Sequence, residues 1–273
     1  MTDPLPLLVS VVTPSFNSET YLAECLESVQ NQTHLAVEHV VADGGSTDAT
    51  LDLLRRYSEV RVLPGPDDGM YDGLNKAIRA SRGEVIACLN TDDAYLTDAL
   101  AAVAAAFAAD PALDVLVADA LFVDERGVEQ YRTHLWPFDW DRFVSLDFSS
   151  VVHPAVFWRR RVHDAIGYFD VRYRLAADFD FFARFRGLKV RRLVRPVCRF
   201  RLHSAAQTYR RQAESRAEMA RILEGLGQRD DGPTRLRRFV GRWAFILTCY
   251  RPPLVLLRRA LRRRWHAFLS MPG

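Results

Sequence analysis

Short apolar runs alternate with amphipathic stretches over the N-terminal part of the chain. Leu7–Thr13, Val37–Ala42, Val60–Leu63 and Val85–Leu89 are rich in β-branched residues, which predicts four buried strands. The stretches between them carry apolar residues at helical spacing. Strands that alternate with helices through short loops predict an α/β fold with a doubly wound, mostly parallel sheet.

Three helices are expected between these strands. The first begins at an Asn17 or Ser18 cap and runs to about Gln32, and the second contains Leu51–Leu54. The third covers Met70–Ser81 and turns Leu74, Ala77 and Ile78 inward. Its remaining polar face predicts that Asp72, Asn75 and Lys76 point together at the sheet edge, with Lys76 placed to neutralise a phosphate. A solvated helix face is the alternative.

Polar residues follow the predicted strands where each one ends. Thr13 and Pro14 close the first strand, Asp43 opens a glycine-rich turn after the second, and Asn90–Asp93 follows the fourth. Because the carboxyl ends of parallel strands meet at one edge, these residues predict a ligand site there. Adjacent carboxylates repel one another, and a divalent cation that also contacts phosphates would compensate them. The alternative is that Asp92 or Asp93 caps the next helix, Thr97–Ala109.

Four segments of the chain, in this order and spacing, resemble the inverting glycosyltransferases of family 2, which have the GT-A fold. They are Val9–Asn17, Ala42–Thr50, Asp67–Ile78 and Leu89–Asp93, and the resemblance covers about residues 7–205. It implies transfer of a hexosyl or N-acetylhexosaminyl group from a nucleotide-sugar, foremost a UDP-sugar. The acceptor would be a saccharide or a lipid-linked molecule in bacterial polysaccharide or glycolipid assembly, and the cofactor Mg²⁺ or Mn²⁺.

The resemblance also assigns roles to residues of the predicted edge. Asp92 and Asp93 would hold the metal in a DxD-like motif, and Asp92 would also contact the ribose. Gly44 and Asn90 stand where many members of the family have Asp, so Asp92 and Asp93 are the obvious acidic ligands of that motif. The residues assigned to the nucleotide-sugar are Thr13, Pro14, Asp43, Asp72, Asn75, Lys76, Asn90 and Asp92.

The region after residue 118 resembles the acceptor-side half of the same family. A further strand, Asp114–Ala118, is followed by a predicted hairpin in which Leu121–Asp124 pairs with Val128–Thr133. Close aromatic residues follow, and they are expected to pack in the core more than to line a sugar site. These aromatic residues are Trp136, Phe138 and Trp140.

The predicted helix Leu175–Phe185 carries the candidate general base. Asp178 matches the family's base, which deprotonates the acceptor hydroxyl, and carboxyl groups in apolar surroundings suit that role. The alternative for Asp178 is an acid that satisfies the helix dipole. Asp180 is expected to orient neighbours, and His203, after the strand Val197–Leu202, resembles a metal- or diphosphate-contacting histidine. A structural histidine is the alternative there.

The charge of the chain is uneven. The net charge is +3, yet the segment from Gly232 onward contains many arginines and no acid. Trp-bearing basic helices in this segment predict a peripheral anchor on an anionic membrane surface. The apolar run Trp243–Tyr250 is too short to span a membrane. A docked helix pair, an oligomer interface and nonspecific nucleic-acid binding are the alternatives, and no specific nucleic-acid partner is expected.

The composition, 49% hydrophobic and 26% charged, is typical of a globular protein. With no signal peptide evident and four widely spaced cysteines, we expect a cytoplasmic protein, peripheral on the inner face of the membrane, whose thiols are free and mostly buried. The expected organisation is a catalytic domain of residues 1–205, divided near residue 118, and a helical extension of residues 206–273.

Two other functions remain open at this point. A nucleotidyltransferase shares the α/β sheet and the metal on acids, but it would need a glycine-rich loop with a basic residue after the first strand, where Pro14–Asn17 stands. A catalytically silent relative that binds nucleotide-sugar as a membrane scaffold is compatible with Gly44 and Asn90.

Overall fold

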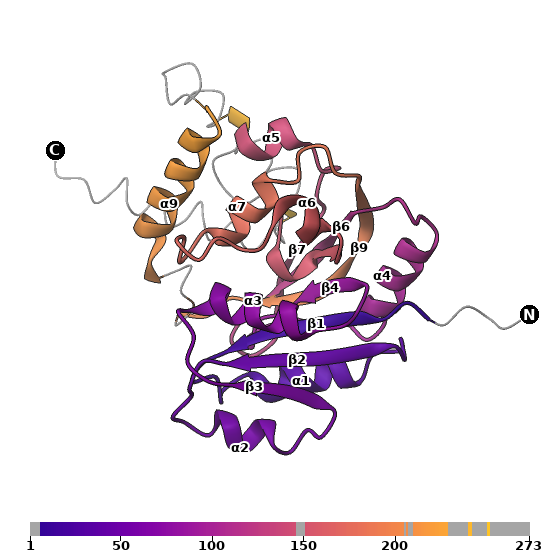
Figure 1. Cartoon of the computed structure of the whole chain (residues 1–273), viewed down its shortest axis with the longest axis vertical. Coiled ribbons are helices and arrows are strands. Elements are labelled where there is room, and N and C mark those ends of the chain that lie inside the picture. Colours follow the sequence, from indigo (N-terminus) through magenta and orange to yellow (C-terminus); the bar gives the residue numbers. More distant parts are fainter. Residues whose placement is uncertain are drawn as a thin grey trace, which may run out of the picture.

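The computed structural model describes residues 6–145, 151–204, 206, 210–228, 240–241 and 250–251. These residues form one α/β unit in which helices flank a ten-stranded sheet (Figure 1). The strands are β1 (Val9–Ser15), β2 (Val37–Asp43), β3 (Val60–Pro64), β4 (Val85–Cys88), β5 (Ala94–Tyr95), β6 (Val115–Val123), β7 (Glu129–Thr133), β8 (Val156–Arg159), β9 (Val190–Arg201) and β10 (Tyr250–Arg251). The helices are α1 (Leu22–Gln30), α2 (Thr50–Leu54), α3 (Met70–Ala80), α4 (Ala99–Ala108), α5 (Trp140–Ser145), η1 (His153–Ala155), α6 (Val162–Ile166), α7 (Ala177–Ala183) and α9 (Gln212–Gly225).

The N-terminal half of the sheet is parallel, as the alternation of strands and helices predicted. β1 pairs with β2 and β4, and β2 pairs with β3, all in parallel. The predicted start of the first helix is wrong, because α1 begins at Leu22 rather than at an Asn17 or Ser18 cap. Asn17 has a left-handed backbone with φ of 48°, and its side-chain carbonyl accepts a hydrogen bond from the Thr47 backbone N–H at 2.9 Å. The segment therefore turns toward the loop after β2 before the helix begins.

The other half of the sheet is mixed. β8 lies antiparallel between β4 and β6, and β6 forms the predicted hairpin with β7. β9 pairs in parallel with β6, and its far end pairs with the two-residue strand β5. The predicted strand Val197–Leu202 is the end of the longer strand β9, which begins at Val190. This long strand carries the chain from the acceptor half back to the edge at which β4 ends.

A cluster of aromatic side chains fills the core on the α3 and α7 side of the sheet. It includes Trp158, Phe181 and Phe182, which are completely shielded from solvent, and each such side chain contributes about 1.5–3 kcal/mol by burial. Trp136, Phe138 and Trp140 pack against this core, as predicted. The indole N–H of Trp140 donates to the Ala183 carbonyl at 2.7 Å, which ties α5 to α7.

Helix α9 is part of the same core. It lies beside α7 (Figure 1) and buries Met219, Ile222 and Leu223 in the aromatic cluster. Further along, β10 pairs antiparallel with β7. Most of the arginine-rich segment, and with it the predicted membrane-binding helices, lies outside the described residues. Among the helices that are described, none has the length and apolar character needed to cross a membrane.

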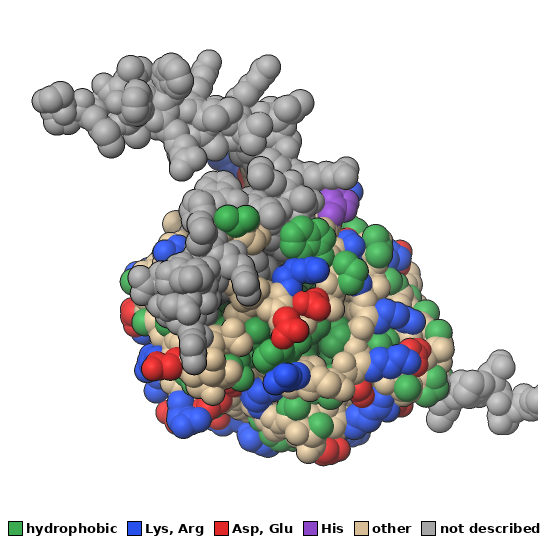
Figure 2. Space-filling view, turned by 90° about the horizontal axis from the view of Figure 1, so that it is seen from above, with side chains coloured by type: hydrophobic (Ala, Val, Ile, Leu, Met, Phe, Trp, Pro, Cys, Tyr) green, Lys and Arg blue, Asp and Glu red, His purple; other side chains and the backbone are tan. Residues whose placement is uncertain are grey.

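The described cysteines are free and buried, and charged side chains of both signs lie on the surface. Cys25, Cys88 and Cys198 are buried free thiols, as predicted, and burial is the main cause that raises the pKa of each. Cys249 lies outside the described residues. Figure 2 shows acidic, basic and hydrophobic side chains interspersed over one face of the described part.

Candidate active site

The loop that follows β4 holds two acids at the carboxyl edge of the sheet. Asp93 is only 3% exposed, and its Oδ1 accepts the backbone N–H of Arg201 at 3.0 Å. Its Oδ2 and the Oδ1 of Asn90 are buried and have no hydrogen-bond partner among the described residues. Burial, with the neighbouring Asp92 carboxylate, raises the pKa of Asp93 well above its usual value. This loop therefore presents buried oxygen atoms that lack a partner within the described structure.

Neither acid caps a helix. The strand β5 follows the loop directly, and helix α4 begins only at Ala99, with Asp98 at the N-cap position. The helix-cap alternative for Asp92 and Asp93 is thus wrong, because the chain first pairs with β9 before it turns into α4.

His203 meets Asp92 at this edge. Its Nε2 lies 2.9 Å from Asp92 Oδ2, although the two residues are 111 positions apart in the chain. The pairing of β5 with β9 produces this contact, since it sets the end of β9 beside the acidic loop. The imidazole ring also packs against Tyr21, with ring centroids 5.3 Å apart. The structure therefore brings together Asp92 and His203, two of the three residues that were assigned to the metal, whereas the Asp93 carboxylate bonds to the Arg201 backbone.

Arg201 organises the same loop, and the sequence analysis missed it. Its buried guanidinium donates to the Asp92 carbonyl at 3.0 Å and to the Asp124 and Glu125 carbonyls at 3.2 Å, and it also pairs with Glu24. A buried cation that binds several carbonyls holds their loops together. An arginine between the apolar residues Phe200 and Leu202 was the available signal.

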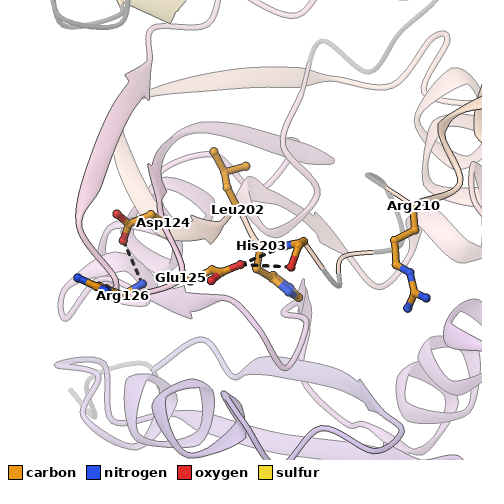
Figure 3. Close-up of a pocket in the computed structure, with 7 residues that line it drawn as sticks. Asp124, Glu125, Arg126, Leu202, His203 and Arg210 are labelled. Carbon is orange, nitrogen blue, oxygen red and sulfur yellow. Dashed lines mark hydrogen bonds between the residues drawn. The ribbon is translucent and has the colours of Figure 1, made fainter. Parts of the chain in front are cut away.

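A cavity of about 670 Å³ opens beside His203 (Figure 3). The turn between β6 and β7 forms one wall, and the residues after β9 form the other. Glu125 accepts hydrogen bonds from the Ser204 backbone N–H and hydroxyl at 3.2 and 3.4 Å, which joins these walls. The lining residues are Asp124, Glu125, Arg126, Leu202, His203, Ser204 and Arg210.

The ends of β1 and β2 are more enclosed than the sequence suggested. Thr13 is fully buried, and its hydroxyl lies 2.9 Å from His39 Nε2, so its side chain does not reach the edge. Pro14 is also buried. The Asp43 carboxylate accepts from the Ser46 hydroxyl at 2.6 Å and from the Gly45 and Ser46 backbone N–H groups at 3.1 and 2.9 Å. Asp43 therefore shapes its own turn.

Asp67 is a second residue that the sequence analysis did not single out. A Cβ atom on Gly44 would lie 2.7 Å from Asp67 Oδ2, so the Asp67 carboxylate occupies the space beside this glycine. Burial, with a smaller contribution from Asp72 and Asp43, raises the pKa of Asp67. An acid thus stands next to the position where many members of the resembled family have Asp. Its place at the start of the Asp67–Ile78 motif was the available signal.

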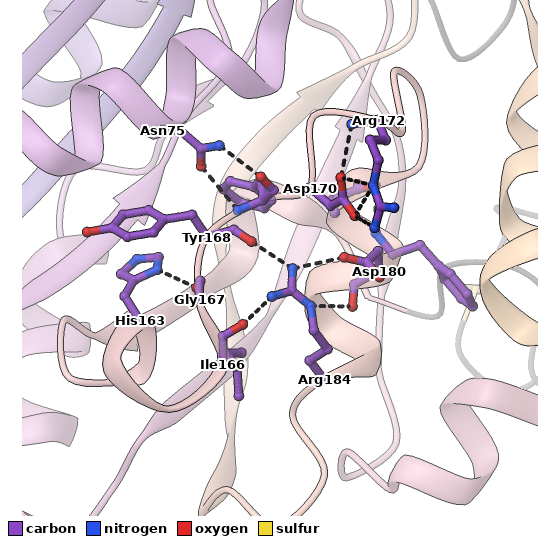
Figure 4. A network of polar contacts seen from close by, with 12 residues as sticks. Asn75, His163, Ile166, Gly167, Tyr168, Asp170, Arg172, Asp180 and Arg184 are labelled. Atoms are coloured by element: carbon purple, nitrogen blue, oxygen red, sulfur yellow. Dashed lines mark hydrogen bonds and ion pairs between the residues drawn. The ribbon is translucent and has the colours of Figure 1, made fainter. Parts of the chain in front are cut away.

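The three polar residues of α3 do not share one face. Asp72 and Lys76 form an ion pair of 3.0 Å, and the Lys76 ammonium also donates to the Pro66 carbonyl. Asn75 is buried and faces the opposite way, where it donates to the Phe169 carbonyl at 2.8 Å and accepts the Phe169 N–H at 3.1 Å (Figure 4). The predicted common orientation is wrong for Asn75, because the loop after α6 covers that side of the helix.

Asp178 lies in the first turn of α7. Its Oδ1 accepts the Tyr71 hydroxyl at 3.0 Å and the Phe179 backbone N–H at 2.8 Å. Asp180 points elsewhere and pairs with Arg184 at 2.8 Å, within the network of Figure 4. Burial raises the pKa of Asp180, although Arg184 acts in the opposite direction. Only Asp178 of these two acids is tied to α3.

The family is decided by comparison with known proteins. Residues 10–167 match the family model described as glycosyl transferase family 2. The chain belongs to this family. It is a glycosyltransferase with the GT-A fold, and Asp178, Arg201 and His203 lie beyond the residues that the family model matches.

Relatives agree with this assignment. A PGL/p-HBAD biosynthesis glycosyltransferase of Mycobacterium tuberculosis is 32% identical over 182 residues, which cover 64% of this chain and 68% of that protein. Chondroitin synthase of Pasteurella multocida is 27% identical over 182 residues, which cover 65% of this chain and 18% of that protein. The crystal structure of Staphylococcus aureus TarS in complex with UDP has a similar fold, with a TM-score of 0.62 and 24% identity over 80% of this chain and 64% of that one. The part of TarS that this chain matches is thus less than two thirds of the TarS chain.

The acidic loop of this glycosyltransferase fits a divalent cation. Hard cations take oxygen ligands, and the orphaned buried oxygens of Asp93 and Asn90 are of this type. In the described part of the chain, no three His, Cys, Asp or Glu side chains form a complete ligand set. Mg²⁺ is usually held by one or two carboxylates together with substrate phosphates, so a partial set is the expected arrangement.

Proposed function

We propose that this glycosyltransferase is metal-dependent and inverting, and that it moves a hexosyl or N-acetylhexosaminyl group from a nucleotide-sugar to a hydroxyl of a saccharide or lipid-linked acceptor. The observation that carries the proposal is the contact of Asp92 with His203 beside the buried Asp93. An acid and an imidazole from distant parts of the chain meet at the sheet edge where α/β folds bind ligands, next to a second, buried acid.

Similar proteins support a nucleotide-sugar donor. TarS structures contain UDP and UDP-GlcNAc, and a mannosyltransferase from Pyrobaculum calidifontis, with a TM-score of 0.60 and 18% identity over 88% of this chain and 70% of that one, contains GDP-Man and Mn²⁺. A UDP-sugar is our first choice of donor. The names of the mycobacterial glycosyltransferases and of the chondroitin synthases support an acceptor in glycolipid or polysaccharide assembly.

Asp178 is the proposed general base. It takes the proton of the acceptor hydroxyl, whose oxygen attacks the anomeric carbon on the face opposite the departing diphosphate. The bond between the anomeric carbon and the diphosphate oxygen breaks with inversion, and its electron pair leaves with the diphosphate. Asp92, Asp93 and His203 would hold Mg²⁺ or Mn²⁺, which supplies Lewis-acid stabilisation of the leaving group's charge.

The proposed nucleotide side is the edge formed by β1, β2 and the start of α3. The Asp43 turn and Pro14 shape it, and Asp67 adds a carboxylate beside Gly44 for recognition of the base or ribose. Lys76, already neutralised by Asp72, fits the phosphates less well than the sequence suggested. Residues 1–118 would thus form the nucleotide half and 119–205 the acceptor half, with 206–273 as the extension.

Binding of nucleoside diphosphates tests the site. We would titrate UDP, GDP and ADP calorimetrically, with and without Mn²⁺, into the wild type and into Asp92→Asn and Asp93→Asn. One diphosphate should bind in a metal-dependent manner, and each variant should weaken it at least about tenfold, or 1.4 kcal/mol. Asp98→Asn is the matched control, since this exposed acid near the loop pairs only with Arg195 among the described residues. Affinity that is indifferent to metal and to both acids would contradict the proposal.

A turnover assay distinguishes an active glycosyltransferase from a catalytically silent protein that only binds the nucleotide-sugar. Metal-dependent release of diphosphate from a donor, with the product's anomeric configuration read by NMR, should show turnover with inversion. A retained configuration would refute the inverting mechanism.

The membrane is the proposed location, through the basic segment. Full-length protein should sediment with vesicles that contain phosphatidylglycerol and should remain in solution with pure phosphatidylcholine, because the attraction is electrostatic. A chain that lacks residues 234–273 should lose this binding. Equal sedimentation of the truncated chain would remove the anchor from the proposal.

A further inference from the structure

The segment that leads into α7 is held by a carboxylate from another helix. Glu218 of α9 is 7% exposed, and it accepts the backbone N–H groups of Arg174 at 3.0 Å, Leu175 at 2.8 Å and Ala176 at 3.0 Å. α7 has no side-chain cap of its own at Ala176. The amide of an N-cap residue has no partner within its own helix, and Glu218, 42 to 44 positions further along the chain, accepts it together with the two amides before it.

Tyr71 reaches Asp178 from α3. Its hydroxyl donates to Asp178 Oδ1 at 3.0 Å, and the ring is buried at the start of α3. Burial, with the Asp178 carboxylate, raises the pKa of Tyr71 well above its usual value. The hydroxyl therefore keeps its proton and remains a hydrogen-bond donor at physiological pH.

The remaining groups around Asp178 leave one of its oxygens available. The Phe179 N–H also donates to Oδ1, and no hydrogen bond within the described residues uses Oδ2. Within the described residues, His153 of η1 also faces Asp178, and burial lowers the pKa of this imidazole although Asp178 acts in the opposite direction. The carboxylate thus has one anchored oxygen and one that can take a proton.

We propose that Tyr71 and Glu218 are positioning residues for Asp178, which rests on the proposed role of Asp178 as the base. Glu218 fixes the chain at the entry to α7, and Tyr71 fixes the carboxylate through Oδ1. The acceptor hydroxyl then gives its proton to Oδ2 while its oxygen bonds to the anomeric carbon. The helix that carries Glu218 lies outside residues 10–167, which the family model matches. The base is therefore positioned by a helix that is not part of the matched region.

Conservative variants of the full-length chain test this assignment. Turnover is measured as diphosphate released, with Mn²⁺ and with water supplying the attacking hydroxyl, from an equimolar mixture of UDP-glucose, UDP-galactose, UDP-N-acetylglucosamine and GDP-mannose. Tyr71→Phe and Glu218→Gln should each lower turnover by about 10- to 100-fold, the usual effect of a lost hydrogen bond to a charged or positioning group. UDP and GDP affinity should change less than about twofold, because the nucleotide edge is untouched. The acidic limb of the pH–rate profile should move to higher pH in Tyr71→Phe.

Each of the two variants has a control in which the same type of residue is changed in the same way. Glu214→Gln changes an exposed glutamate one turn before Glu218 that pairs with Arg211, and Tyr57→Phe removes an exposed hydroxyl bonded to Glu27. Both should keep wild-type turnover. Turnover in Tyr71→Phe and Glu218→Gln that equals these controls would overturn the inference.

A double variant separates positioning from a general structural effect. In the Asp178→Asn background, Tyr71→Phe should cost less than about twofold more, because the two residues act as one unit. An equal loss in both backgrounds would overturn the inference. If circular dichroism shows that Glu218→Gln does not fold, the inference is tested by comparing Tyr71→Phe in the wild-type and Asp178→Asn backgrounds. Full turnover in Asp178→Asn, or none in the wild type with the whole mixture, would instead refute the proposed function.

Discussion

His163 makes the structure sensitive to acid. It lies on α6 and is 6% exposed, and the Trp158 indole N–H donates to its Nε2 at 2.9 Å. Nε2 is therefore unprotonated, and the proton sits on Nδ1, which donates to the Gly167 carbonyl at 2.9 Å. Protonation of Nε2 would break the contact with Trp158. Burial is the main cause that lowers the pKa of His163 to about 4.

The size of the effect follows from linkage. The folded pKa lies below the unfolded value of about 6.5, so the unfolded chain takes up the proton first as the pH falls. The contribution of His163 is fully present above about pH 6.5 and is lost as the pH falls toward about 4. The whole shift corresponds to roughly 3 kcal/mol, of which about 2 kcal/mol should disappear between pH 7 and pH 5.

Urea unfolding at pH 7, 6 and 5 measures this loss. His163→Gln keeps an acceptor for Trp158 and a donor for Gly167 but cannot titrate. The wild type should therefore lose about 2 kcal/mol more than the variant between pH 7 and pH 5. Buried His39, whose pKa is lowered to about 3, changes the free energy of unfolding equally in both proteins, so its effect cancels in the comparison. His134→Gln is the control and should follow the wild type, whereas parallel curves for the wild type and His163→Gln would refute the reasoning.

Two further substitutions test the packing around the site. Asn75→Ala should lower the free energy of unfolding by about 2–4 kcal/mol in urea titrations, because two buried backbone groups lose their partner, while the exposed Asn31→Ala should change it by less than about 0.5 kcal/mol. Gly44→Ala should displace the Asp67 carboxylate and weaken diphosphate binding in calorimetry. Gly225→Ala, whose Cβ would meet nothing within 4 Å, should bind as the wild type does; equal affinity for both variants would contradict the role of the Gly44 contact.

The local pattern of the sequence predicted the elements of the nucleotide half. The four apolar runs became β1–β4 with shifts of one or two residues at their ends, because buried strands and amphipathic helices leave regular periodicities. The acidic loop was also placed at the sheet edge, since the end of a parallel strand defines it. The helix start at Leu22 was missed, because the left-handed turn at Asn17 is stabilised by residues after β2.

Partners of individual side chains were decided only by tertiary structure. Periodicity placed Asn75 on the face of α3 opposite Leu74. Which loop covers that face depends on how the acceptor half packs. In the structure the loop after α6 covers it and bonds to Asn75. The same holds for Arg201, whose guanidinium collects carbonyls from loops far apart in the chain.

The sequence by itself determined the strands, the helices and the edge at which the acids gather, because these depend on residues close together along the chain. The tertiary structure decided that His203 meets Asp92 and that Glu218 holds the start of α7. Such contacts join residues separated by 42 to 111 positions, and only the packing of whole elements brings these together.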